Sequence, residues 1–137
     1  MGLADLLAEL RAAPEHRDNF VAWHELPARP ARYAAVPDAV HPEVMAALRA
    51  RGIARLWTHQ AQAAAVALRG EHVVVVTPTA SGKTLCYNLP VLSTILHRPA
   101  SRALYLFPTK ALAQDQLDEL HGLITATGRD IQTFTYD

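Results

Sequence analysis

The chain has 137 residues, half of them hydrophobic, and thirteen Lys plus Arg balance thirteen Asp plus Glu. This length and composition allow one modest domain with a packed core. A formal net charge of zero gives no basic signature, so charge alone predicts no nucleic-acid partner. The single cysteine, Cys86, excludes a disulfide framework within the chain and is expected to be a buried thiol.

The start of the chain does not have the pattern of a signal peptide, because it lacks a basic opening and mixes acidic residues with its leucines. No apolar run reaches the length of a membrane span. These features predict a cytoplasmic protein that has no membrane partner.

The N-terminal part is predicted to hold one short helix followed by an extended segment. Leucines at positions 3, 6, 7 and 10 mark one apolar helical face, and Pro14 is expected to end that helix. Prolines recur from there to Pro42 without any sustained period, which indicates an extended segment lying over a domain surface. Trp23 and Tyr33 within it are expected to anchor packing, with a nucleic-acid surface as the alternative.

Two helices are predicted next. Pro42 occupies the first position of a helix that Gly52 ends. Thr58 has the chemistry of an N-cap for a second helix, which runs through Leu68 and is closed by Gly70.

The C-terminal half is predicted to alternate strands with helices. Short runs rich in β-branched or aromatic residues indicate strands at 72–77, 103–107 and 131–136. Apolar segments of helical length lie between them, at 85–96 and 110–121. Pro90 is expected to kink the first of these helices and Gly122 to end the second. This order predicts an α/β fold whose parallel sheet binds ligands at the carboxyl ends of its strands.

The segment 77–84 reads TPTASGKT and lies between a predicted strand and a predicted helix, which is the context of a phosphate-binding P-loop. Gly82 lets backbone N–H groups approach a polyphosphate, and the following helix directs its positive end at the anion. Lys83 supplies a flexible charge to the outer phosphates, and the Thr84 hydroxyl is placed to bind Mg²⁺. The expected phosphate-binding residues are Thr79, Ala80, Ser81, Gly82, Lys83 and Thr84. Thr77 departs from the full pattern, which has Gly there.

Three segments occur in the order and spacing of the first motifs of superfamily 2 helicases: Trp57-Thr58-His59-Gln60, TPTASGKT at 77–84 and PTKALAQDQ at 108–116. In that family the P-loop commonly begins with Ala or Thr, so Thr77 agrees with it. From Trp23 onward the chain further resembles the MrfA/YprA-type subgroup of DEAD/DEAH-box helicases. The resemblance implies a P-loop NTPase of RecA-like fold, with 1–41 as an N-terminal extension and 42–137 as part of the first lobe.

The resemblance also assigns roles to single residues. Gln60 matches the glutamine that reads adenine, and a carboxamide suits adenine because it donates and accepts at once; Gln62 is the alternative. The aromatic residue that normally stacks on the base is not evident at its usual spacing. Thr109 and Lys110 match positions that contact one nucleic-acid strand, although Thr109 could equally cap its helix.

No DExH or DEAD sequence follows Thr84, so the acidic residues that position Mg²⁺ and the attacking water are missing. We therefore expect the ATP-binding fragment of an ATP-dependent DNA helicase or translocase, with Lys83 as its catalytic residue and ATP, Mg²⁺ and nucleic acid, DNA favoured over RNA, as ligands. Alone it is expected neither to hydrolyse ATP nor to unwind a duplex, since it needs the rest of its lobe and a second lobe. The alternatives are a non-helicase P-loop ATPase or kinase, and a non-functional gene fragment.

Overall fold

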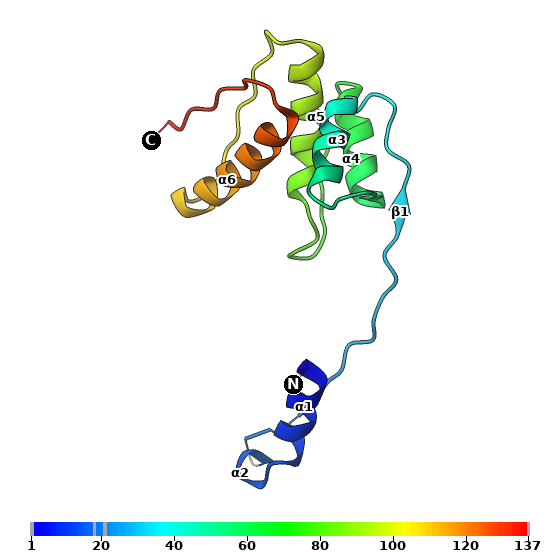
Figure 1. Cartoon of the computed structure of the whole chain (residues 1–137), viewed down its shortest axis with the longest axis vertical. Coiled ribbons are helices and arrows are strands. Elements are labelled where there is room, and N and C mark those ends of the chain that lie inside the picture. The colour runs from blue at the N-terminus through cyan, green and yellow to red at the C-terminus, as the bar shows by residue number, and fades with distance from the viewer. Residues whose placement is uncertain (1, 18, 21, 137) are drawn as a thin grey trace. The chain divides into compact units, whose positions relative to one another are not determined.

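Helices joined by long extended segments form the part of the chain that this computed structural model describes, residues 2–17, 19–20 and 22–136 (Figure 1). The chain divides into two compact units, Met1–Pro30 and Ala31–Asp137. The boundary predicted between 41 and 42 remains a prediction about the domain organisation.

The N-terminal unit contains α1 (Leu3–Ala12) and α2 (Pro14–Arg17). The first helix is as predicted, and the Asp5 carboxylate caps its start by accepting a hydrogen bond from the Gly2 N–H at 2.9 Å. The second was predicted as extended chain, and that prediction is wrong at 14–17. Proline suits the first position of a helix, so Pro14 both ends α1 and begins α2.

Trp23 packs against α1 in this unit. The Arg11 guanidinium lies 4.1 Å from the centroid of the Trp23 ring and makes an ion pair with Glu25 at 2.7 Å. The Phe20 ring lies 5.6 Å from that of Trp23. Trp23 is 37% exposed and its contacts lie within the N-terminal unit, so anchoring of the extended segment on a domain surface stays a prediction.

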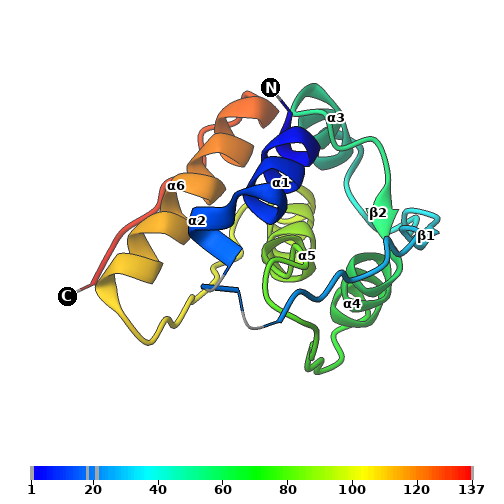
Figure 2. The same ribbon diagram turned by 90° about the horizontal axis from the view of Figure 1, so that it is seen from below.

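The C-terminal unit is a layer of four helices with a short antiparallel ribbon. Its helices are α3 (Pro42–Ala50), α4 (Thr58–Leu68), α5 (Thr84–His97) and α6 (Lys110–Thr127). The ribbon pairs β1 (Tyr33–Ala34) with β2 (Leu56–Trp57), placing Tyr33 opposite Trp57. Helix α5 lies between α4 and α6 (Figure 2). Large side chains from these elements fill the core, namely Val44, Leu48, Leu56, Leu89, Leu92 and Leu123.

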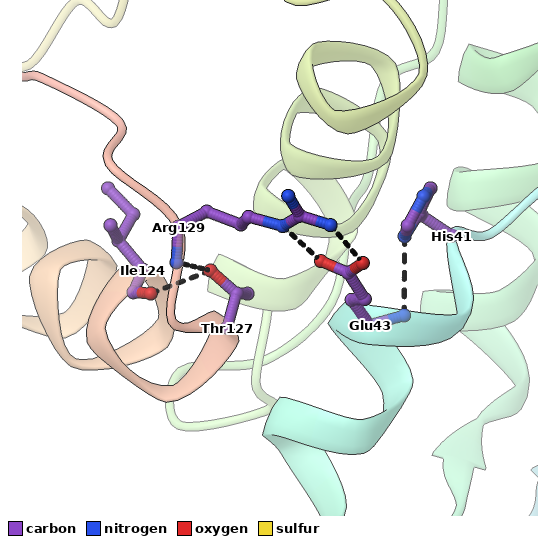
Figure 3. A network of polar contacts seen from close by, with 5 residues as sticks. All are labelled: His41, Glu43, Ile124, Thr127 and Arg129. Atoms are coloured by element: carbon purple, nitrogen blue, oxygen red, sulfur yellow. Dashed lines mark hydrogen bonds and ion pairs between the residues drawn. The ribbon is translucent and has the colours of Figure 1, made fainter.

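Polar contacts fasten α3 to the end of α6 (Figure 3). The Arg129 guanidinium donates two hydrogen bonds to the Glu43 carboxylate, at 2.7 and 2.5 Å. His41 caps α3 by accepting from the Glu43 N–H, and the Thr127 hydroxyl donates to the carbonyl of Ile124 in the last turn of α6. Arginine thus bridges two helices that are far apart in sequence.

The predicted strands at 72–77, 103–107 and 131–136 do not pair, and β1 with β2 is the one sheet among the described residues. Their side chains nevertheless alternate as in a strand. Val75, Tyr105 and Ile131 turn inward, while others are more than 80% exposed: Val74, Val76, Leu104, Leu106 and Phe134.

The prediction of paired strands is wrong for this chain, because within the described residues the three extended segments share no ladder of backbone hydrogen bonds. A cavity of about 460 Å³, lined by Val73, Val75 and Phe107, touches two of the segments. One side-chain bond does secure the second segment, since the Tyr105 hydroxyl donates to buried Asn88 of α5 at 2.9 Å. The helices therefore support strand-like segments that lack neighbours.

Two further helix predictions need correction. The N-cap of α4 is Trp57, and Thr58 is already helical. Helix α6 does not stop at Gly122 but continues to Gly128, whose φ of +68° ends it. Burial of Leu123 and Ile124 in the core explains this continuation, because it outweighs the roughly 1 kcal/mol that glycine costs inside a helix.

Candidate nucleotide-binding site

The loop before α5 twice adopts left-handed backbone angles, at Ala80 (φ 58°) and Gly82 (φ 68°). Such angles cost a residue with a side chain roughly 1–2 kcal/mol. At Gly82 a Cβ would also lie 2.6 Å from the Gln60 amide nitrogen, so any residue with a side chain there would displace Gln60 in addition to straining the backbone. Alternating backbone hands of this kind form concave nests of N–H groups that bind anions.

Lys83 folds back over this loop. Its ammonium group donates to the carbonyls of Thr77 and Pro78, at 3.0 and 2.7 Å, and to the Ser81 hydroxyl at 3.4 Å. The hydroxyls of Thr77 and Ser81 lie 2.6 Å apart and close the loop. Thr77 therefore contributes both its carbonyl and its side chain where the general pattern has glycine.

The first turn of α4 binds the loop from the other side. The Gln60 amide donates to the carbonyl of Gly82 at 3.0 Å and accepts from the Trp57 N–H at 2.9 Å. His59 contacts the neighbouring carbonyl, that of Ser81, through Nε2 at 2.8 Å. Two consecutive side chains thus hold two consecutive loop carbonyls. Sequence reasoning missed His59, and its position beside Gln60 in one helical turn was the available signal.

Thr84 begins α5 and donates its hydroxyl hydrogen to Gln116 Oε1 of α6 at 3.0 Å. The same oxygen accepts a hydrogen bond from the Tyr87 hydroxyl. The described residues hold no group of three or more acidic, His or Cys side chains that could bind a metal alone. One hydroxyl beside a phosphate-binding loop suits Mg²⁺, which keeps several waters and binds largely through substrate phosphates.

A cavity of about 660 Å³ lies beside the loop, a size typical of small-molecule sites. Gln60, Gly82 and Thr84 line one part of it, and Tyr33 and Trp57 of the ribbon line another. The Arg55 guanidinium stacks over the Tyr33 ring at 4.0 Å. The pairing of β1 with β2 thus brings an aromatic residue to the predicted site from a position that motif spacing did not indicate.

Thr109 and Lys110 lie together at the start of α6. The Thr109 hydroxyl accepts from the Leu112 N–H at 3.2 Å, which is the capping role considered from the sequence. Both residues are exposed. Their contact with nucleic acid stays a prediction.

Cys86 is buried in α5, as predicted. Burial raises the pKa of its thiol, with an opposing contribution from a backbone hydrogen bond. A thiol held in this neutral form is a poor nucleophile.

A loop with this geometry, followed directly by a helix, is typical of the P-loop class of proteins. The chain belongs to the DEAD/DEAH box helicase family, whose profile matches residues 57–136. None of the helices within the described residues is long and apolar enough to cross a membrane.

Individual relatives match almost the whole chain. The ATP-dependent helicase YprA of Bacillus subtilis is 50% identical over 135 residues, which are 98% of this chain and 18% of YprA. The ATP-dependent helicase hrq1 of Schizosaccharomyces pombe is 36% identical over 140 residues, covering 98% of this chain and 13% of hrq1. The chain therefore spans less than a fifth of the length of these relatives.

The solved structure of the DUF1998 helicase MrfA bound to DNA and AMPPNP is similar to this chain with a TM-score of 0.84 and 49% identity. The match covers 99% of this chain and 19% of MrfA. It confirms the predicted class of fold, an incomplete RecA-like P-loop domain, and the predicted subgroup.

Proposed function

We propose that this chain is the ATP-binding portion of an ATP-dependent DNA helicase or translocase. The observation that carries the proposal is the loop at 77–84 beside a cavity of about 660 Å³. In this loop Ala80 and Gly82 have left-handed backbone angles, and Lys83 folds back onto the carbonyls of Thr77 and Pro78. The likeness to MrfA, whose solved structure holds DNA and AMPPNP, supports it.

Lys83 and Thr84 have the central roles in this proposal. Lys83 leaves the carbonyls of Thr77 and Pro78 and donates to the outer phosphates, because a phosphate oxygen is the stronger acceptor. Thr84 offers its hydroxyl oxygen to Mg²⁺ while its hydrogen remains on Gln116. When bound, the cation neutralises charge on the phosphates. The backbone N–H groups of 79–84 orient the phosphates at the start of α5.

Gln60 is the proposed reader of adenine. It lines the cavity and is 5% exposed, whereas Gln62 is exposed. The Gln60 amide is bonded to the backbone at both ends, so reading the base means exchanging one of these partners. Tyr33, with Arg55 stacked on it, is the aromatic surface available to the base.

Thr109 and Lys110 are the proposed contacts to a nucleic-acid strand. A hydroxyl, a cation and the N–H groups of the first turn of α6 converge at one exposed helix end, and these groups favour phosphate. DNA is favoured because MrfA was solved with DNA.

The chain alone is proposed not to hydrolyse ATP. The acidic residues after Thr84 are Asp115, Asp118, Glu119, Asp130 and Asp137, and none forms a DExH or DEAD sequence. Phosphoryl transfer needs such carboxylates to hold the metal and the attacking water.

The test is titration of the 137-residue chain with a fluorescent ATP analogue in Mg²⁺, together with a phosphate-release assay. Lys83→Ala is expected to weaken binding at least about tenfold, which corresponds to loss of about 1.4 kcal/mol from a charge-assisted bond. Arg102→Ala is the matched cationic control, because among the described residues Arg102 bonds only carbonyls of the connection after α5.

Equal affinity in wild type and Lys83→Ala would refute the P-loop assignment. Steady phosphate release that Lys83→Ala abolishes would refute the absence of hydrolysis.

A further inference from the structure

Gln116 lies on α6, the helix whose start holds the proposed contacts to a nucleic-acid strand. Its side chain connects this helix to Thr84, the proposed metal ligand. Its side-chain oxygen accepts hydrogen bonds from two hydroxyls of α5, those of Thr84 and Tyr87. Gln116 is partly buried and lines both cavities described above. The bond to Thr84 links positions 32 residues apart.

The direction of the hydrogen bond matters for metal binding. A threonine hydroxyl has one hydrogen and two lone pairs, and it binds a cation through a lone pair. Because the Thr84 hydrogen is committed to Gln116, the lone pairs point elsewhere. Without that acceptor the hydroxyl would rotate freely, and its hydrogen could face the cation.

The position of Gln116 on α6 gives the contact a second consequence. Gln116 follows Thr109 by seven positions on one continuous helix, about 10 Å along the axis. Farther along, Glu119 of α6 makes an ion pair with Arg51 at 3.1 Å. Gln116 therefore links Thr84 to the same helix whose start holds Thr109 and Lys110.

We propose that Gln116 is a positioning residue that orients the Thr84 hydroxyl toward Mg²⁺ and thereby couples a strand at the start of α6 to metal-dependent nucleotide binding. The inference rests on the proposed function, because it presupposes a nucleotide on the P-loop and a strand at Thr109 and Lys110.

The experiment compares Gln116→Met with Tyr87→Phe in the full chain. Gln116→Met keeps the side-chain length and removes the acceptor, whereas Tyr87→Phe removes the other donor and leaves the bond between Thr84 and Gln116. The dissociation constant of a fluorescent ATP analogue is measured in Mg²⁺ and in EDTA, each with and without a single-stranded oligodeoxynucleotide.

We expect Gln116→Met to reduce the ratio of the EDTA to the Mg²⁺ dissociation constant by about tenfold, since residues that orient metal ligands typically contribute 10–100-fold to metal affinity. Its affinity in EDTA should be unchanged, and the oligonucleotide should no longer alter its affinity in Mg²⁺. Tyr87→Phe should behave as wild type within about twofold. Gln116→Glu retains an acceptor and should keep the ratio at the wild-type value or above.

An equal loss of affinity in Mg²⁺ and in EDTA would show a merely structural role and overturn the proposal. An unchanged ratio in Gln116→Met would overturn it as well. If circular dichroism shows that Gln116→Met does not fold, the test uses Gln116→Glu instead. A fall in its ratio of the EDTA to the Mg²⁺ dissociation constant would then count against the proposal. Absence of nucleotide binding by wild type would instead refute the proposed function, and the inference with it.

Discussion

Substitution of Gly82 by alanine tests the geometry of the loop most directly. The added Cβ meets two obstacles, the positive φ of 68° and the Gln60 amide nitrogen 2.6 Å away. Gln60 would have to move and give up its bond to the Gly82 carbonyl. Because Gln60 is 5% exposed, water cannot readily replace that bond.

The expected magnitude follows from these two obstacles. The left-handed backbone costs alanine roughly 1–2 kcal/mol, and a buried amide left without its partner costs about 1–3 kcal/mol. Together they oppose the observed loop by about 2–5 kcal/mol, and partial relaxation favours the lower end. At about 1.4 kcal/mol per tenfold, the affinity for a nucleotide should fall at least about thirtyfold.

Gly70→Ala is the matched control. Gly70 also has a positive φ, 80°, but no atom lies within 4 Å of the position that its Cβ would take. This variant should lose roughly 1–2 kcal/mol of unfolding free energy in urea and retain full nucleotide affinity. The two proteins are compared by urea unfolding followed by circular dichroism and by titration with a fluorescent ATP analogue. Wild-type affinity in Gly82→Ala, or an equal loss of affinity in Gly70→Ala, would refute the reasoning.

Two further predictions concern the helices. The hydrogen bonds from Arg129 lower the pKa of the Glu43 carboxyl, so this pair stabilises the folded state above the usual carboxyl pKa and loses that effect as the pH falls through the lowered pKa. The Tm of Glu43→Gln should therefore fall less steeply on acidification than that of the wild type. Identical profiles of Tm against pH would contradict this. Thr109→Ala should reduce the unfolding free energy by about 1 kcal/mol through loss of the α6 cap. In the same urea titration Thr109→Ser should keep the wild-type unfolding free energy, because serine retains the hydroxyl. Equal losses in the two variants would show that the capping hydroxyl contributes nothing.

The helices were largely predictable from the sequence because their signals are local. The spacing of the leucines predicted α1. Pro42 at the start and Gly52 at the end predicted α3. Helix α6 was predicted too short, since only tertiary burial of Leu123 carries the chain past Gly122. Local pattern likewise identified the alternating side chains of the extended segments, but a strand also needs a partner, which local pattern does not supply.

The site was predictable as far as its motifs extend. The P-loop residues and Gln60 do lie together, as motif order implied. His59 had a local signal in its position beside Gln60. The contact of Gln116 with Thr84 joins two helices that meet only in three dimensions, so the residue type of Gln116 carried no specific signal. Tyr33 reaches the cavity through the β1–β2 pairing, and its distance in sequence from Gln60 concealed it.

The alternating side chains of the extended segments have a consequence for how a larger sheet could assemble. Tyr105 and Ile131 already pack against the helical core, while Leu104, Leu106 and Phe134 face outward. A slip of one residue would exchange the two sets and expose the packed side chains to water. Packing on the helices therefore fixes which face each segment presents. Any strand that paired with one of these segments would accordingly meet a single alignment, the one that keeps Tyr105 and Ile131 against the helices.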